Sequence, residues 1–409
     1  MKMFQTLDKQ LRLNLLILFA AGLLFWSSIG SLLPTLPLYI AEIGASKQQI
    51  GIVMGGFAIG MLLFRGSMGK LSDRRGRKIV LLIGSFVVAI APFGYLVVKS
   101  IPLLMAVRVF HGISIAAFAT GYLALVVDLT STNIRGEVIG YMSLVTPLGI
   151  AIGPAFGGYL QAGLGYEALF IASGMCGVLT FLCILPIISP PIHSQPANQK
   201  QIKFWQILVS PRVKIPSLIM FLVGIGSGIL HTFIPLFIKS TGVDLNPGLF
   251  YAVAAIASFS ARLFSGRASD RFGRGLFVTI SLTVYTLGFS FLWQATDKNT
   301  FLLGAILEGA GSGVVIPIIS TLMSDRSQPY ERGQIFAVCI MGLDLGIAIA
   351  GPLIGYIAEE FGYRNTFGLA TFLTASAIII FLTFSSKGIE NSFRFATGRG
   401  KDFYALEKS

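Results

Sequence analysis

The chain has 409 residues, of which 54% are hydrophobic and only 12% are charged. This composition lies far from the soluble average and indicates a protein whose helices cross a membrane several times. The formal net charge is +13, but the basic residues are spread over one predicted membrane face, where topology and anionic lipids explain them. We therefore expect no nucleic-acid partner.

Twelve apolar segments, each close to the length of about 20 residues that spans a bilayer, follow one another along the chain. Polar or Gly/Pro-containing breaks separate them. In the first half they cover residues 13–40, 48–68, 79–98, 102–127, 137–161 and 166–188, and in the second half residues 215–238, 247–265, 276–295, 301–323, 334–358 and 365–385. The pattern predicts two sets of six transmembrane helices.

The polar stretches divide the chain into four parts. We expect an N-terminal six-helix bundle over residues 1–188, a flexible cytoplasmic linker over 189–212, a C-terminal six-helix bundle over 213–386, and a mobile cytoplasmic tail over 387–409. No loop is long enough for a second folded domain. The function is therefore expected to reside in the membrane helices.

Lys and Arg are concentrated on one side of the predicted spans. If the N-terminus is cytoplasmic, the outer loops carry only Lys47, Lys99, Lys239, Lys298 and Arg364. The excess of basic residues on the other side places both termini in the cytoplasm. The sequence thus predicts a multi-pass protein of the plasma (inner) membrane.

The two halves share a repeat. The ten residues Gly69–Lys78 recur as Gly266–Gly275, shifted by 197 positions, and the same shift relates Asp128 to Asp325. A register held over most of the chain indicates two homologous halves. Duplicated halves in a membrane protein are typical of transporters.

The repeated Gly-x-x-x-Asp-Arg-x-Gly-Arg loop between helices 2 and 3 resembles the signature of the major facilitator superfamily, and the resemblance extends over nearly the full chain. In that family the loop is a cytoplasmic latch that favours the outward-facing state. The alternative is a pair of basic loops that simply turn at glycine. The expected gate comprises Gly69, Asp73, Arg74, Gly76, Arg77, Asp128 and Arg135, with their counterparts Gly266, Asp270, Arg271, Gly273, Arg274, Asp325 and Arg332.

Glycines in this gate have two expected roles. Gly69 and Gly266 are expected to let helices approach closely. Gly76 and Gly273 are expected to permit a tight turn between two helices.

Helix 4 contains a second signature, Arg108-Val-Phe-His111-Gly112, which resembles the family motif with His111 where Gln is more usual. A cation inside a span requires a partner or a water-filled cavity. Arg108 and His111 are three residues apart and share a helix face. Two alternatives remain: Arg108 extends to the outer interface, and His111 packs as a neutral side chain.

Helix 5 contains the third signature, with Gly149, Gly153, Pro154, Gly157 and Gly158. Glycines four residues apart allow the backbone of another helix to approach, and Pro154 favours a bend. Within the superfamily this pattern is associated with proton-driven antiporters, especially drug exporters. We expect Gly153 and Pro154 to pack at the interface between the halves. Ordinary small-residue packing is the alternative.

The spans of the second half contain three further ionisable residues, His231, Glu308 and Asp344. Asp344 lies near the middle of its span, where an ionised carboxylate is costly. We predict Asp344 as the first proton carrier and Glu308 as the second, with Arg108 and His111 modulating them. His231 is expected near the translocation path, together with Arg108, His111 and Glu308. A satisfied polar contact between helices is the alternative for both acids.

The resemblance implies an all-α membrane fold of twelve transmembrane helices, arranged as two six-helix bundles with pseudo-twofold symmetry, with helices 1, 4, 7 and 10 lining a central cavity. The predicted function is export of a small organic molecule, drug-like or a metabolite, by proton antiport through alternating access. The alternatives are a proton-coupled importer or facilitator of a metabolite, and a membrane receptor or enzyme on this scaffold. Residues 13–40 lack the carboxylate that many drug/proton antiporters carry in helix 1, which argues against cation recognition there. The expected partners are the substrate, protons and lipid; we expect a monomer without cofactor, metal or catalytic residue.

Overall fold

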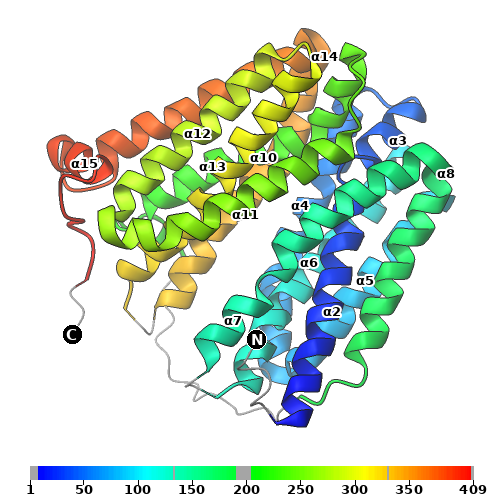
Figure 1. The fold of residues 1–409 in the computed structure, drawn as a ribbon, viewed down its shortest axis with the longest axis horizontal. Helices are drawn as coiled ribbons and strands as arrows, with labels where there is room; N and C mark the ends of the chain where they lie inside the picture. Colours follow the sequence, from blue (N-terminus) through cyan, green and yellow to red (C-terminus); the bar gives the residue numbers. More distant parts are fainter. Residues whose placement is uncertain (1–7, 132–133, 190–203, 329–330, 407–409) are drawn as a thin grey trace. The chain divides into compact units, whose positions relative to one another are not determined.

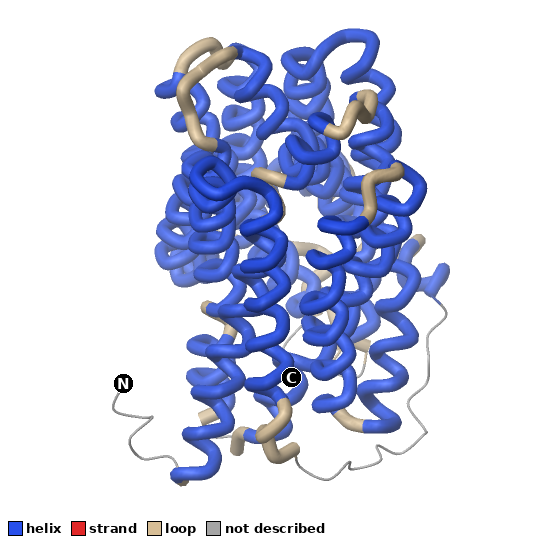
Figure 2. The backbone as a smooth tube through the Cα atoms, turned by 90° about the vertical axis from the view of Figure 1, so that its right-hand side faces the viewer, coloured by secondary structure: helices blue, strands red, loops and turns tan. Residues whose placement is uncertain are grey.

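Every regular element in the computed structural model is a helix, within the residues that the structure describes: 8–131, 134–189, 204–328 and 331–406 (Figures 1 and 2). The bilayer core offers no water to bond backbone N–H and C=O groups, so a spanning segment must satisfy them internally, as a helix does. The all-α prediction is confirmed.

The helices alternate with short turns along the chain. In the first half they are α2 (Lys9–Ser31), α3 (Leu36–Glu42), α4 (Lys47–Arg75), α5 (Arg77–Val97), α6 (Ile101–Leu129), α7 (Arg135–Met142) and α8 (Val145–Ile184). In the second half they are α9 (Phe204–Leu208), α10 (Lys214–Thr241), α11 (Pro247–Phe272), α12 (Arg274–Gln294), α13 (Lys298–Asp325), α14 (Arg332–Phe384) and α15 (Ile389–Ala396). Most of the predicted linker, residues 190–203, lies outside the described residues.

Ten continuous helical stretches of the described chain are long and apolar enough to cross a membrane. The sequence predicted twelve spans, and the two numbers agree because α8 and α14 each contain two spans joined at a glycine kink. The kinks are at Gly165, with φ 83°, and at Gly362, with φ 79°. Glycine adopts such positive φ values without the steric cost that other residues meet. The two kinks are also 197 residues apart, so the repeat extends to the backbone conformation.

Contacts divide the chain into two compact units. The first comprises Met1–Ala45, Ile52–Gln195 and Asn246–Ala252, and the second comprises Ser46–Gly51, Pro196–Leu245 and Val253–Ser409.

Aromatic stacking contributes to the core of the first unit. Phe25 of α2 stacks on Phe118 of α6, with ring centroids 3.8 Å apart and planes 7° from parallel. Phe118 in turn stacks on Tyr122, at 5.5 Å. All three side chains are almost completely buried. They connect α2 to α6, the helix that carries Arg108 and His111.

The C-terminal tail is folded onto the second unit through a buried arginine. Arg326, the residue after α13, is fully buried, and its Nε and Nη2 atoms donate to the two carboxylate oxygens of Asp402, at 2.6 and 2.9 Å. Its guanidinium also donates to the carbonyl oxygens of Arg212 and Ser385, at 3.1 and 2.9 Å. The prediction of a mobile tail is therefore wrong for residues 387–406. The buried guanidinium of Arg326 requires a counter-charge, and the carboxylate of Asp402 supplies it from this segment. Leu129 occupies the equivalent position in the first half.

Replacing Asp402 by Ala is expected to destabilise the second unit. The substitution leaves a guanidinium buried without its counter-charge, which costs about 3–5 kcal/mol. Thermal unfolding of the purified chain in detergent should show a melting temperature lower by several degrees. Glu390→Ala is the matched control, because the Glu390 side chain is 86% exposed and its pair with Arg394 is on the surface. Equal melting temperatures for the two variants would contradict the role given to Asp402.

Candidate functional site

Arg77 joins three helix ends in the first unit. Its guanidinium forms ion pairs with Asp73, near the end of α4, and with Asp128, at the end of α6, where Nε and Oδ2 are 3.2 Å apart. It also donates to the hydroxyl of Ser72, at 3.0 Å. Because Arg77 is the first residue of α5, a single side chain ties α4, α5 and α6 together across the turn at Gly76.

The second unit repeats this arrangement with equivalent residues. Arg274, the first residue of α12, pairs with Asp270 near the end of α11, at 2.8 Å, and with Asp325, the last residue of α13. The sequence predicted these residues as gate residues, and the structure shows how they are paired. Each arginine bridges two carboxylates from two other helices.

The gate glycines fulfil one of their two expected roles. Gly76 and Gly273 have φ values of 94° and 98°, which turn the chain sharply between helices as expected. Gly69 and Gly266 behave differently, since a β-carbon built on either would meet no atom within 4 Å. The expectation that these two glycines allow close helix approach is therefore wrong for contacts within each unit.

The other predicted gate arginines lie around the loops. Arg74 and Arg332 are exposed. Arg271 lies over the ring of Phe272, with its guanidinium carbon 5.2 Å from the centroid. Arg135 donates to the carbonyl of Thr130, at 3.2 Å.

Replacing Asp73 by Asn should affect transport much more than stability. The Asp73 side chain is 72% exposed, and surface ion pairs contribute only roughly 0.2–1 kcal/mol. If the loop holds one transport state, we expect the transport rate in proteoliposomes to fall roughly tenfold, within the range that a loss of about 1–3 kcal/mol of coupling produces. Lys70→Gln, an exposed change in the same loop, is the control. Unchanged transport by Asp73→Asn would count against the latch.

A buried polar cluster lies in the first unit around α6. His111 is fully buried, and its Nδ1 is 3.0 Å from the hydroxyl of Tyr95. Arg108, 6% exposed, lies with its guanidinium carbon 4.4 Å from the ring centroid of Phe57, an attractive cation–π geometry. Arg108 is therefore buried and does not extend to the interface.

Two nitrogen atoms of this cluster, Arg108 Nε and His111 Nε2, have no hydrogen-bond partner among the described residues. The described part of the first unit also provides no ion pair to Arg108. A buried cation of this kind attracts negative charge. The cluster can thus interact with an anionic or polar group.

The second unit holds the other predicted ionisable residues on three helices. Glu308 of α13 is 5% exposed and Asp344 of α14 is 4% exposed, while His231 of α10 is half-buried. The backbone of Glu308 packs directly against Gly288 of α12, where a β-carbon would be 2.5 Å from the Glu308 nitrogen. This contact fixes the position of the Glu308 backbone on α13.

Glycines of the helix-5 motif pack against α2. A β-carbon on Gly153 would lie 2.6 Å from the carbonyl oxygen of Ser27, and one on Gly157 would collide with the carbonyl of Ser31. Gly149 packs in the same way one turn earlier. The predicted close approach of another helix backbone is confirmed.

The partner of Gly153 differs from the expectation. Gly153 packs on α2 within its own half, so the expectation that it lies at the interface between the halves is wrong. Pro154 and Gly158 face the residues that begin α11, since Gly158 packs against Asn246 and Gly248, and Gly248 against the carbonyl of Pro154. These residues all belong to the first unit.

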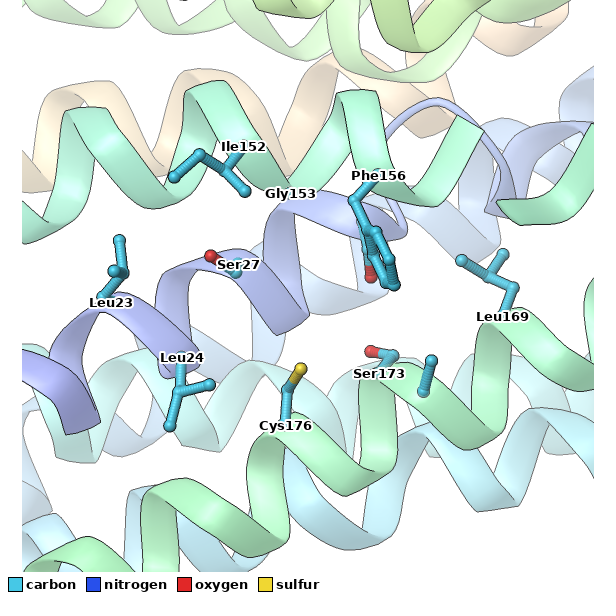
Figure 3. A pocket seen from close by; sticks show the side chains of 11 residues that line it. Leu23, Leu24, Ser27, Ile152, Gly153, Phe156, Leu169, Ser173 and Cys176 are labelled. Carbon is cyan, nitrogen blue, oxygen red and sulfur yellow. The ribbon is translucent and has the colours of Figure 1, made fainter. Parts of the chain in front are cut away.

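A cavity of about 250 Å³ lies behind the helix-5 motif, between α2 and the two limbs of α8. These limbs are the parts of α8 before and after the kink at Gly165. Figure 3 shows Ile152 and Phe156 on one limb, and Ser173 and Cys176 on the other. Ser27 of α2 also lines it. The sequence did not reveal this cavity, because its walls come from segments that only the fold brings together.

Gly153→Leu should disrupt both features. The larger side chain would collide with α2 and enter the cavity, and overpacking of a tight helix contact costs roughly 1–3 kcal/mol. We expect loss of transport or a leak in proteoliposomes. Gly163→Leu is the control, because a β-carbon on Gly163 would meet nothing within 4 Å. If both variants transported normally, the motif would not control the packing of α2 on α8.

Repeated units of membrane-spanning helices, matching bridged loops and buried ionisable side chains define a multi-pass membrane transporter and not an enzyme. The sequence profile of the Major Facilitator Superfamily matches residues 18–267 and 216–402. The chain belongs to this superfamily.

Two curated relatives cover most of the chain. An uncharacterised MFS-type transporter of Salmonella typhimurium (strain LT2) is 30% identical over 372 residues, which is 86% of this chain and 91% of that protein. The quinolone resistance protein NorA of Staphylococcus aureus (strain COL) is 24% identical over 354 residues, covering 83% of this chain and 89% of NorA.

Solved structures share the fold at lower identity. The nucleoside transporter NupG has a TM-score of 0.75 at 16% identity, covering 90% of this chain and 99% of that one. A D-xylose–proton symporter has a TM-score of 0.76 at 16% identity, covering 92% and 98%. These likenesses confirm the predicted twelve-helix fold class.

Proposed function

We propose that the chain exports a small organic molecule from the cytoplasm by proton antiport. The observation that carries this proposal is the burial of two carboxyl groups, Glu308 and Asp344, inside membrane-spanning helices. An acidic side chain is costly in hydrocarbon and is retained where its protonation is used. Proton coupling uses such a group, because the carboxyl must be loaded on one side of the membrane and emptied on the other.

The direction and the substrate class rest on the helix-5 motif and on the relatives. The motif's glycines pack α8 tightly against α2, and this glycine–proline pattern is associated with exporters in the superfamily. A relative that is named for quinolone resistance supports a drug-like substrate. The D-xylose–proton symporter shares only the fold, so it does not favour uptake.

The proposed cycle assigns one task to each group. Asp344 carries the proton first and Glu308 second, while Arg108 and His111 of the first unit adjust them and interact with the substrate. Substrate binding and protonation are then coupled, because each changes the affinity for the other by the same factor. The bridged loops at Arg77 and Arg274 hold the cytoplasmic side closed in one state of the cycle.

The proposed placement follows from the same features. The chain is a multi-pass protein of the plasma membrane and acts as a monomer with both termini in the cytoplasm. The support for this orientation is the concentration of Lys and Arg on the side that carries the bridged loops.

Replacing Asp344 by Asn should separate transport from its driving force. An amide keeps the size and polarity of the side chain but neither gains nor loses a proton near neutral pH. We expect substrate binding and downhill exchange to continue in proteoliposomes, and uphill transport driven by a pH gradient to cease. Glu360→Gln, an exposed change on the same helix, is the control.

Two results would revise this assignment. Uphill transport by Asp344→Asn would exclude Asp344 as the carrier, and Glu308→Gln would be tested next. If wild-type vesicles accumulated substrate together with protons and not in exchange for them, the chain would be an importer.

A further inference from the structure

The short helix α15 forms one surface against the protein and leaves another uncovered. Ser392, Phe395 and Ala396 are buried against the second unit. The ring of Phe395 packs on Phe381 of α14, with centroids 6.0 Å apart, and Thr279 of α12 donates to the carbonyl of Ala396, at 2.8 Å. The helix is thus seated beside the ends of two membrane-spanning helices.

The uncovered surface is apolar next to this seat. Ile389 is 66% exposed and Phe393 is 51% exposed, and their spacing of four residues places them on one side of the helix. Phe384, the last residue of α14, is 57% exposed. Ile280 of α12, part of a membrane-spanning surface, is 46% exposed. Exposed apolar side chains thus lie on α15 and on both of the membrane-spanning helices against which it packs.

Basic side chains surround the same helix. The exposed residues of the tail include Lys387, Arg394, Arg399 and Lys401. Glu390 is the one exposed acid between residues 387 and 406, since Asp402 is paired with Arg326. This excess of positive charge beside an apolar surface is complementary to anionic lipid headgroups.

The position of α15 is fixed at both of its ends. Its N-terminal end follows directly from α14, and its C-terminal end leads to Asp402, which is clamped by Arg326. The Arg326 guanidinium carbon also lies 5.6 Å from the ring centroid of Phe395. The helix is therefore held beside the start of α12 and the end of α14.

We propose that α15 is an interfacial anchor that binds anionic phospholipid. Ile389 and Phe393 enter the boundary between headgroups and acyl chains, and the neighbouring basic side chains bind headgroup phosphates. This inference does not depend on the direction of transport or on proton coupling.

The test uses the full chain in vesicles, with Cys176, Cys183 and Cys339 changed to Ala. An environment-sensitive fluorophore is attached at Phe393→Cys or, as the matched control, at Glu390→Cys on the charged side of α15. The vesicles contain phosphatidylcholine and phosphatidylglycerol. Brominated acyl chains quench a fluorophore that lies in the lipid, and iodide quenches a fluorophore that is exposed to water.

At position 393 we expect lipid quenching several-fold stronger than at position 390, with the reverse order for iodide. Equal access of iodide to both positions would overturn the anchor. Protection of position 393 from both quenchers would also overturn it, because the surface would then be covered by protein, such as a second copy.

The charge requirement is tested separately, with the label at Ile389→Cys. Brominated phosphatidylglycerol should quench the label at least about twofold more than brominated phosphatidylcholine, because anionic lipid accumulates near basic side chains. Changing Lys387, Arg394, Arg399 and Lys401 to Gln should reduce this ratio to one. The charge-conserving variant Arg394→Lys with Arg399→Lys should keep the ratio, as expected if the tail remains folded. A ratio of one in the unaltered tail would contradict binding of anionic lipid.

Discussion

Close packing of helices through glycine is the constraint on which the rest of the structure depends. In a bilayer the hydrophobic effect does not drive helices together, because lipid is as apolar as a leucine side chain, so helices associate through van der Waals contact at short range. In the first unit α8 meets α2 at Gly153 and Gly157, and in the second unit α14 meets α10 at Gly346 and Gly224. The same solution recurs in both units because their sequences are repeated.

These contacts also determine where the ionisable groups lie. Glu308 is placed by the contact of its backbone with Gly288, and Gly112 packs against the backbone of α4 directly beside His111. A longer side chain at either glycine would displace the helix that carries the ionisable group. The depth of charge in the membrane is therefore set by residues that have no charge themselves, which is how a structure of apolar helices can hold a few costly groups in defined positions.

The repeat made much of this fold predictable. The packing of the helices was harder to predict, because apolar side chains face both the lipid and the protein interior. A shift of 197 residues predicted paired gate residues, and the kinks at Gly165 and Gly362 follow it too. The neighbours of each helix were not predictable, because lipid-facing and protein-facing positions use the same residues. On α11, Phe250 is fully buried and Phe264 is 77% exposed, although both are phenylalanine. The packing of the helix-5 motif, the cavity and the folded tail all depend on such neighbours, so the sequence could not reveal them.

The clamp between Arg326 and Asp402 has a consequence for the order of synthesis. The two residues are separated by 76 positions. During translation the N-terminal parts of a chain fold first. Arg326 is therefore made well before Asp402 and has no carboxylate from that residue until the intervening segment, with all of α14, has been synthesised. The first unit, which has Leu129 at the equivalent position, has no such delay, so the two halves of one duplicated fold mature by different schedules.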